Sequence, residues 1–448
     1  MLRFAPSPTG YLHTGNARVA VLNYLYAKHK ELEFFLRIDD TDQERSDEKF
    51  VDAIIEDLSW LGITFDRIIK QSDRTRDYKD TFEFLKNKEF IYPCFETSDE
   101  LALKRKVQLK LGKPPIYDRS ALKLTKNEIS KFISSGKNPH WRLKLDDDPI
   151  SWDDQVHGKI SFDHLSISDP VVFRSDEMPL FTITSVVDDS EFNVSHILRG
   201  DDHITNTAAQ IKLFKYLDSP IPKFGHFPLM RSKTGGGLSK RSNSFSLREF
   251  KEKKITPLVL MNYLNKIGTS SSIDELQSVD DLIKKFELSI FSKNSVLFDL
   301  DDLTRLNSKY IKNVNYSELK KNINVEFDEK FWDIIKSNVS SYDEANEWFD
   351  IIKGINKNTE KIKVDSFFFE NICNNLPSEI TKQSWNEWTK KIKEAVNIKP
   401  KDIYVTLRII LTGKNYGPSM NELLTLFTRE EILKRIIANC EKTTNKDI

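Results

Sequence analysis

The sequence predicts an α/β fold, with a parallel sheet covered by helices, followed by a helical C-terminal region. Three observations support this fold class. Residues 1–26 read as a short apolar strand, a loop rich in proline and glycine, and a helix. Strand and helix patterns then alternate up to about residue 88, and beyond about Leu247 the apolar spacing becomes helical.

The composition sets the class of protein. A chain of 448 residues is long enough for several domains, and its 39% hydrophobic and 30% charged content is typical of a soluble globular protein. The formal net charge is zero, so any nucleic-acid binding must depend on local basic patches. The three cysteines contain no Cys-x-x-Cys pair, and we expect neither a disulfide framework nor a zinc site.

Neither an apolar leader nor an apolar run of about eighteen residues is present, and we therefore expect a cytoplasmic protein without membrane contact.

The first loop is the strongest candidate site. His13, Gly15 and Asn16 directly precede a helical pattern that opens at Ala17. The unpaired N–H groups and positive dipole end of a helix N-terminus favour an anion such as a triphosphate, and Gly15 lets the anion approach the backbone. The alternative is an ordinary surface loop.

The next elements place acids at a strand end. Residues 33–38 form an apolar run of strand length that ends at Asp39 and Asp40, and helical patterns follow over 51–61 and from about Asp77 to Lys88. Open parallel sheets bind ligands at the carboxyl ends of their strands. One carboxylate could hold a substrate ammonium, or the acids could form a solvated turn.

Between about Glu96 and Glu177 the alternation lapses and a basic stretch appears. It is the best candidate RNA surface in this half of the chain, although a solvated helix face is the alternative. Its candidate contacts are Lys104, Arg105, Lys106, Lys110 and Arg119.

The sheet resumes at about Pro179, and a later apolar strand delivers Arg199 to its end before a helix begins at Thr205–Thr207. An arginine there suits bidentate capture of a carboxylate, although a structural salt bridge with a nearby aspartate is the alternative.

A basic, glycine-rich loop follows over residues 230–242. Its three glycines precede Leu238, Ser239 and Lys240. Such a loop suits a phosphoryl centre whose negative charge grows in the transition state.

Farther along, Trp385, Trp388 and Ile392 recur on one helical face, and we interpret that stripe as core rather than as a platform for bases.

The string Ala5-Pro6-Ser7-Pro8-Thr9-Gly10-Tyr11-Leu12-His13-Thr14-Gly15-Asn16 resembles the first signature of class I aminoacyl-tRNA synthetases, in the variant of glutamyl-tRNA synthetases. Residues 195–207 resemble the second block of active-site residues in this family, and residues 237–241 its lysine-loop signature. The glutaminyl enzymes usually have a different string where this chain has residues 5–9, so this stretch favours glutamate over glutamine as the substrate.

The resemblance implies the site residues. It assigns His13 and Lys240 to catalysis, and it assigns ATP binding to His13, Gly15, Asn16, Asp202, Leu238, Ser239 and Lys240. It assigns glutamate binding to Arg3, Ala5, Ser7, Asp39, Phe181, Ser185 and Arg199. Four positions depart from the family pattern: Asp39 replaces a glutamate, Phe181 a tyrosine, Ser185 an asparagine and Gly237 a lysine.

The resemblance also implies a domain order. We expect the first half of a Rossmann-like catalytic domain in 1–95, an inserted α+β acceptor-stem-binding domain in 96–177, and the second catalytic half with the lysine loop in 178–245. A helical stem-contact domain in 246–310 and an all-helical anticodon-binding domain in 311–448 would follow. Some family members hold zinc in the inserted domain. Here Glu96 stands where their second cysteine would be, and we expect no zinc.

The function implied is ATP-dependent attachment of L-glutamate to tRNA(Glu) through a glutamyl adenylate, by a monomer that uses Mg²⁺. Three alternatives remain open. The chain could be a non-discriminating enzyme that also or mainly glutamylates tRNA(Gln), or an inactive tRNA-binding paralogue. A paralogue that modifies a tRNA base is the third, although such proteins lack an anticodon domain.

Overall fold

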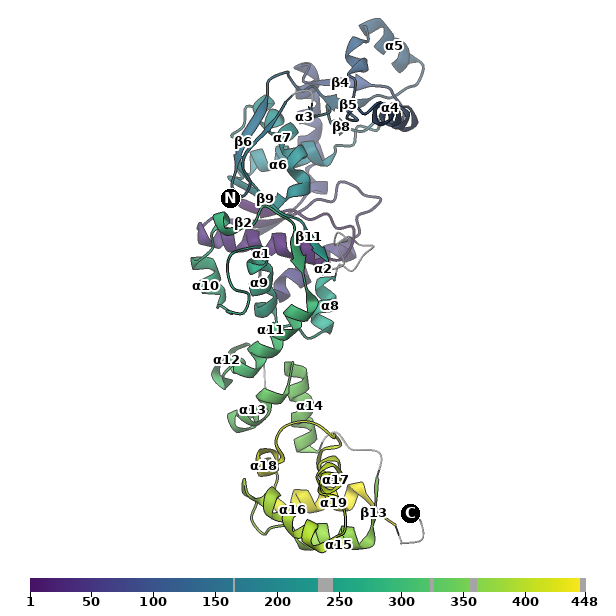
Figure 1. The fold of residues 1–448 in the computed structure, drawn as a ribbon. Helices are drawn as coiled ribbons and strands as arrows, with labels where there is room; N and C mark the ends of the chain where they lie inside the picture. The colour runs from purple at the N-terminus through teal and green to yellow at the C-terminus, as the bar shows by residue number, and fades with distance from the viewer. Residues whose placement is uncertain (164–165, 233–244, 323–325, 355–360, 444–448) are drawn as a thin grey trace. The chain divides into compact units, whose positions relative to one another are not determined.

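The computed structural model describes residues 1–163, 166–232, 245–322, 326–354 and 361–443 (Figure 1). They form two compact units, one of residues 1–253 and 257–300, the other of residues 254–256 and 301–448. The first unit contains the first three expected segments and most of the fourth. The finer division into domains stays a prediction.

The centre of the first unit is a five-stranded parallel sheet in the order β10-β9-β1-β2-β3, as the alternation of strands and helices predicted. Its strands are β1 (Leu2–Phe4), β2 (Phe34–Ile38), β3 (Arg67–Lys70), β9 (His196–Gly200) and β10 (Lys223–Phe227). Every residue of β2 is buried, because a parallel strand inside an α/β fold has both faces covered.

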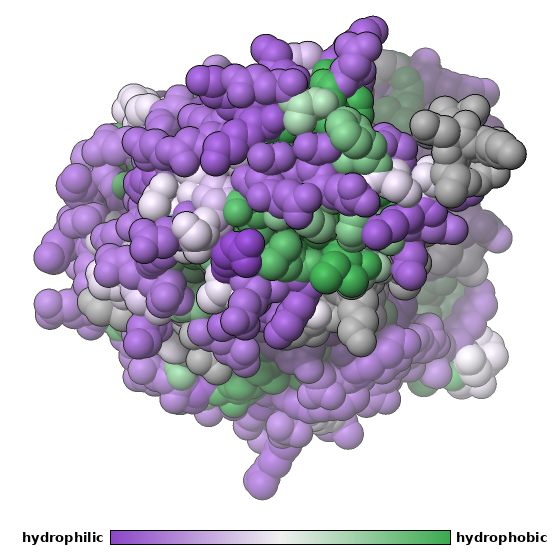
Figure 2. Space-filling model, turned by 90° about the horizontal axis from the view of Figure 1, so that it is seen from below, coloured by the Kyte–Doolittle hydropathy of each residue, from purple (hydrophilic) through white to green (hydrophobic). Residues whose placement is uncertain are grey.

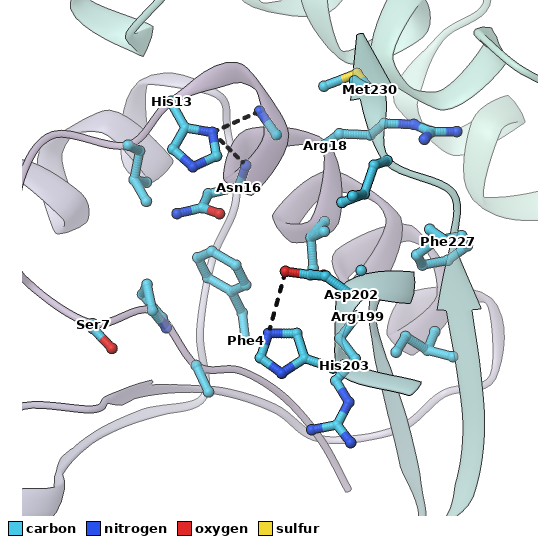
Figure 3. Close-up of a pocket in the computed structure, with 18 of the residues that line it drawn as sticks. Phe4, Ser7, His13, Asn16, Arg18, Arg199, Asp202, His203, Phe227 and Met230 are labelled. Atoms are coloured by element: carbon cyan, nitrogen blue, oxygen red, sulfur yellow. Dashed lines mark hydrogen bonds and ion pairs between the residues drawn. The ribbon is translucent and has the colours of Figure 1, made fainter. Parts of the chain in front are cut away.

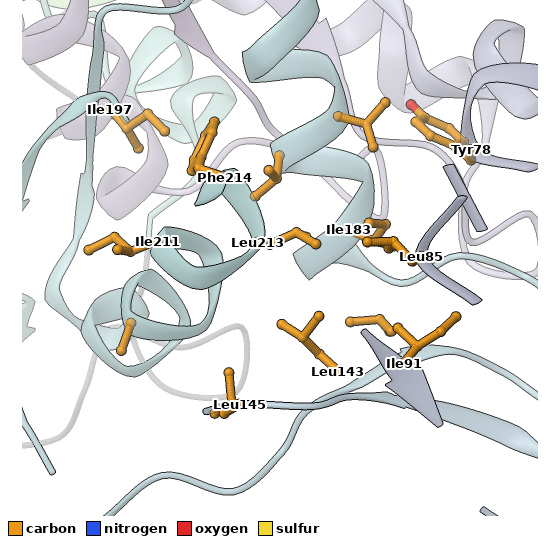
Figure 4. Close-up of a cluster of buried hydrophobic side chains, with 14 of the residues drawn as sticks. Tyr78, Leu85, Ile91, Leu143, Leu145, Ile183, Ile197, Ile211, Leu213 and Phe214 are labelled. Atoms are coloured by element: carbon orange, nitrogen blue, oxygen red, sulfur yellow. The ribbon is translucent and has the colours of Figure 1, made fainter. Parts of the chain in front are cut away.

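Helices cover both faces of this sheet. Phe34 of β2 meets Tyr24 of α1 on one face, whereas Phe35 belongs to a core shared with α3, α6 and α7 on the other (Figure 4). The helices of this unit are α1 (Thr14–His29), α2 (Glu48–Trp60), α3 (Thr75–Asn87), α4 (Ser98–Lys110), α5 (Lys126–Ser134), α6 (Phe181–Glu191), α7 (Ile204–Tyr216), α8 (Leu247–Glu252), α9 (Pro257–Lys266) and α10 (Val279–Lys284).

The inserted segment is α+β, as expected. Its β5 (His140–Leu143) and β8 (Val171–Phe173) form an antiparallel sheet with β4 (Ile91–Cys94), which precedes the expected boundary, and β6 (Ile150–Asp154) pairs with β7 (Gly158–Phe162) as a hairpin. Ile91 and Leu143 share the core of α3 and α7, whereas Tyr92, Cys94 and Ala121 form a small cluster of their own. A short parallel pair, β11 (Met230–Ser232) with β12 (Val296–Phe298), completes the unit.

The second unit is mainly helical. Its helices are α11 (Leu300–Asn313), α12 (Tyr316–Asn322), α13 (Glu329–Ile335), α14 (Tyr342–Lys353), α15 (Ser366–Asn374), α16 (Ser384–Ala395), α17 (Pro400–Thr412), α18 (Met420–Leu423) and α19 (Arg429–Asn439). Trp385, Trp388 and Ile392 are buried, which confirms the core interpretation of that stripe. One parallel pair that the sequence did not indicate joins β13 (Ile362–Asp365) to β14 (Cys440–Thr443).

Hydrophilic residues dominate the face shown in Figure 2, and the hydrophobic ones gather in a small group among them. None of the helices in the described ranges combines the length and the apolar character that crossing a membrane requires.

Candidate active site

A cavity of about 700 Å³ opens at the carboxyl ends of β1 and β9 (Figure 3). Its walls come from the first loop, the start of α6 and the segments that follow β9 and β10. It brings together nine of the predicted site residues, namely Arg3, Ala5, Ser7, His13, Gly15, Asn16, Phe181, Arg199 and Asp202. These predicted residues therefore meet at the carboxyl edge of the sheet, where open parallel sheets bind ligands.

His13 caps the helix that follows it. Its Nδ1 accepts hydrogen bonds from the backbone N–H groups of Gly15 (3.0 Å) and Asn16 (3.4 Å), as Figure 3 shows. A neutral imidazole whose Nδ1 accepts carries its proton on Nε2, so that edge of the ring is a donor. A Cβ on Gly15 would lie 2.8 Å from Cε1 of His13. The glycine thus makes room for the capping ring.

The segment after the lysine loop returns to this first loop. Thr14 donates from both its N–H (2.9 Å) and its Oγ1 (2.7 Å) to the carbonyl of Phe245, and the N–H of Leu247 donates to Leu12 (3.0 Å). The predicted residues Leu238, Ser239 and Lys240, together with Gly237, lie outside the described residues. Their roles stay predictions.

Arg199 lies at the end of β9 and is 6% exposed. Its Nη2 donates to Oγ1 of Thr207 (2.7 Å) and to Oε1 of Gln210 (2.6 Å), whereas its buried Nη1 has no hydrogen-bond partner in the part of the chain that is described. Burial, reinforced by the charge of Arg3, lowers the pKa of Arg199 to about 9. This cation is charged at neutral pH and lacks a bonded carboxylate, so an anionic ligand would satisfy it.

Arg3 is also buried, but an internal carboxylate already holds one edge of it. Its Nε and Nη2 donate to the two oxygens of Asp189, at 2.9 and 3.1 Å. Arg37 donates to the same carboxylate at 2.9 Å. Burial alone would raise the pKa of Asp189, but the two arginines lower it. Asp189 therefore orients Arg3 at the cavity wall.

Arg37, which sequence reasoning missed, holds two of the predicted glutamate contacts. It donates to both oxygens of Asp39 (2.7 and 3.1 Å) and to Oγ of Ser185 (3.3 Å). Burial raises the pKa of Asp39 to about 6, against the attraction of Arg37. Ser185 is fully buried and lines none of the described cavities, and its contact with substrate stays a prediction.

Asp39 lines a second cavity, of about 480 Å³, instead of the first. Ser7, Thr9 and Phe181 line both, so the two cavities adjoin. The site consequently offers two neighbouring compartments, one beside Arg199 and the helix N-terminus, the other beside Asp39.

Asp202 stands at the rim of the first cavity, with its side chain 56% exposed and 4.0 Å from Nε2 of His203. Burial and the charge of Arg199 lower the pKa of His203 to about 4, which keeps this ring neutral at pH 7. His203 also lies 5.3 Å from the ring of Phe181, and sequence reasoning did not select it.

The predicted RNA contacts divide into two groups. Arg105, Lys106 and Lys110 are exposed on α4, a helix without a buried residue. Lys104 instead bonds Glu96, Asp118 and Ser120, and Arg119 bonds Asp169 and the carbonyl of Leu145. Lys104 and Arg119 thus hold the inserted segment together.

Cys94 stands where the zinc site of some family members begins. Here hydrogen bonds and a stacked cation surround it. The hydroxyl of Tyr117 bonds Glu96 (2.8 Å) and approaches Sγ of Cys94 (3.8 Å), while Arg142 lies over the tyrosine ring at 4.0 Å. Within the described ranges, no group of three or more His, Cys, Asp and Glu is placed to hold a metal ion.

Two family models match the chain. Residues 1–305, more than half of it, match the catalytic domain of the class I (E and Q) tRNA synthetases. The chain belongs to this family. In this class I synthetase, residues 343–439 also match an anticodon binding domain.

Curated relatives match the synthetase over almost its whole length. Glutamate–tRNA ligase 2 of Bartonella tribocorum is 43% identical, over 97% of this chain and 99% of the relative. Glutamate–tRNA ligase 1 of Wolbachia sp. subsp. Brugia malayi is 41% identical, with the same coverage. The crystal structure of the glutamate–tRNA synthetase from Elizabethkingia anophelis shares the fold, with a TM-score of 0.77 at 24% identity over 97% of this chain and 98% of that one.

Proposed function

We propose that this synthetase attaches L-glutamate to tRNA(Glu) in two steps at the cavity beside Arg199. The observation that carries the proposal is the buried Nη1 of Arg199, which has no hydrogen-bond partner among the described residues. This arginine lines a cavity whose opposite wall is the N-terminus of α1. One end of the cavity suits a carboxylate and the other a phosphate. The relatives named glutamate–tRNA ligase support the choice of amino acid and nucleic acid.

In the first step, an oxygen of the α-carboxylate of glutamate attacks the α-phosphorus of ATP. The bond from that phosphorus to the bridging oxygen breaks, and pyrophosphate leaves. Arg3 and Arg199 hold the carboxylates of the substrate, and their fixed partners Asp189, Thr207 and Gln210 keep them in place. Positioning of this kind needs no covalent enzyme intermediate.

The same step places growing negative charge on the phosphate oxygens. His13, with its proton on Nε2, is a donor that its bonds to Gly15 and Asn16 orient before the reaction, and the positive end of the α1 dipole lies beside it. We propose that the ammonium group of Lys240 adds a further positive charge. Mg²⁺ would arrive with ATP, because this ion keeps several waters and binds largely through substrate phosphates.

In the second step, the 2′-hydroxyl of the terminal adenosine of tRNA attacks the glutamyl carbonyl carbon, and the bond to AMP breaks. The compartment beside Asp39 adjoins the first cavity, and this carboxylate suits the ammonium group of the glutamyl moiety. We propose that the enzyme works as a monomer in the cytoplasm.

Arg199→Lys tests the proposal, because lysine keeps the charge but loses the planar fork that binds a carboxylate. In ATP–pyrophosphate exchange with tRNA present, we expect the glutamate KM to rise about tenfold or more, as loss of a charged hydrogen bond predicts. The ATP KM should stay within about twofold, since ATP contacts a different wall. A change in the ATP KM alone would contradict the assignment of Arg199.

A further inference from the structure

The surroundings of Arg199 contain a buried pair that the reaction steps above do not use. Asp154, the last residue of β6, and His226 of β10 are 4% and 0% exposed. Nδ1 of His226 lies 2.5 Å from Oδ2 of Asp154. Because β10 runs parallel to β9 with His226 opposite Arg199, the pair stands directly beside the cavity arginine.

The hydrogen-bond pattern fixes the tautomer of His226. A carboxylate only accepts, so Nδ1 of His226 must carry a proton toward Asp154. At the other edge of the ring, Nε2 faces Oγ1 of Thr207 at 2.8 Å and Nε of Arg199 at 3.5 Å. A guanidinium only donates, so Nε2 must present its lone pair there.

Charge supports the same assignment. Burial, reinforced by the charge of Arg199, lowers the pKa of His226 despite its bond to Asp154, so the ring is neutral at pH 7. Burial opposes ionisation of Asp154, but the hydrogen bond from His226 and the N–H groups of His157 and Val156 lower its pKa to about 2. The carboxylate is therefore ionised, and the imidazole between it and the arginine is polarised but uncharged.

Hydrogen bonds of the backbone hold the end of β6 beside β10. The N–H of Gln155 donates to the carbonyl of Phe224 (2.8 Å), and the N–H of His226 donates to Asp154 (3.1 Å). A Cβ on Gly225 would lie 2.6 Å from Cδ2 of Leu198 and 3.3 Å from Cβ of Gln155. The glycine thus leaves room for the side chains of Leu198 and Gln155 at this strand.

We propose that Asp154 and His226 are positioning residues for glutamate binding. They fix the plane of the Arg199 guanidinium, with Nε toward His226 and Nη2 toward Thr207 and Gln210, so that Nη1 is left for the substrate carboxylate. The inference deepens the proposed function and rests on it. It makes the hairpin of the inserted segment a part of amino-acid recognition.

Two variants of the same residue separate positioning from packing. In His226→Gln, the side-chain oxygen can take the place of Nε2 and still accept from Arg199. In His226→Asn, the shorter amide reaches only the position of Nδ1, keeps the contact with Asp154 and leaves Nε of Arg199 without an acceptor. Both remove the ring, and asparagine leaves the larger void, so the comparison of folding is needed to separate a loss of packing from an effect on binding. Lys223→Ala, an exposed change on the same strand, is the control.

The experiment measures KM for glutamate and for ATP by ATP–pyrophosphate exchange with tRNA present, with circular dichroism to compare folding. We expect His226→Asn to raise the glutamate KM about tenfold or more, His226→Gln about threefold or less, and both to leave the ATP KM nearly unchanged. Equal effects of the two variants, or an unchanged glutamate KM in His226→Asn, would overturn the inference while wild-type exchange upholds the proposed function. Failure of the wild type to exchange with glutamate would overturn the proposed function, and the inference with it.

Discussion

His13 serves the fold and the site with the two edges of one ring. Its Nδ1 caps α1, and that bond leaves the Nε2 proton as a donor. Helix N-caps are usually Ser, Thr, Asp or Asn, and a histidine in this place indicates that the ring is required for more than capping. The two roles can therefore be separated by substitution.

His13→Asn should keep the cap, because asparagine is among the best N-cap residues, and should lose the second donor. We expect the rate of glutamate activation to fall about a hundredfold or more, as loss of one oriented donor does elsewhere. The free energy of unfolding should stay within about 0.5 kcal/mol of the wild type. Single-turnover activation and urea titration measure the two quantities.

His13→Ala is the matched variant. It removes both edges of the ring, so activation should fall as in His13→Asn and stability should fall as well, by about 1 kcal/mol. Unchanged activation in His13→Asn would show that the cap is the only role of this residue.

The site residues that belong to a short sequence motif could be predicted, whereas the buried residues that bond to them could not. The first loop and Arg199 follow from local patterns and Asp202 from the family resemblance, and all of them line one cavity. Ser185 turned inward because Arg37, an arginine inside a fully buried strand, needs acceptors. The signal was present, since a charged residue within an apolar strand demands a partner, but the identity of that partner depends on which helix covers the strand.

At the scale of elements, one carboxylate joins α3 to α6. Asp188 accepts from Nε2 of Gln71 (2.6 Å), Nε of Arg74 (2.7 Å) and the hydroxyl of Tyr78 (3.0 Å), and it is fully buried. These partners come from the turn before α3 and from α3 itself. The contact fixes the helix that carries Phe181 and Asp189 and thereby the cavity wall.

Asp188→Ala should destabilise the protein by about 1–3 kcal/mol, because it leaves the buried donors of Gln71 and Tyr78 without their acceptor. Asp80→Asn on α3, which removes a partner of an exposed ion pair, should change stability little. Thermal midpoints of both variants, compared with the wild type by calorimetry, provide the measurement. Similar midpoints for the two variants would contradict the role of Asp188.

Helix α4 presents charge together with exposed apolar groups. Arg105, Lys106 and Lys110 are exposed, and Leu103 and Leu109 are 64% and 60% exposed. The sequence predicted this basic surface, but it could not show that Lys104 and Arg119 bond within the segment. The remaining three cations are the ones available to a phosphate backbone.

Replacing Arg105, Lys106 and Lys110 by alanine should weaken tRNA binding and make its dependence on salt shallower, by about one unit of slope per lost phosphate contact. Replacing the exposed Arg76, Lys79 and Lys88 removes the same charge from another part of the first unit. Filter binding at several salt concentrations compares the two triple variants. Equal losses would indicate a general charge effect instead of a contact at α4.

At the scale of the whole molecule, the fold class and the order of elements could be predicted from hydrophobic periodicity and from the positions of proline and glycine. The parallel sheet, its covering helices and the helical second unit are as predicted. The pairing of β13 with β14 was not, because strands of four residues far apart in sequence carry too little pattern.

The measurement that tests the central claim most directly is glutamylation by the purified full-length chain of separate tRNA(Glu) and tRNA(Gln) transcripts, with ATP and magnesium. The proposed function predicts ATP-dependent charging of tRNA(Glu) with glutamate. Charging of both transcripts would keep that claim and add the second substrate. Charging of tRNA(Gln) alone, or of neither transcript while tRNA still binds, would contradict it.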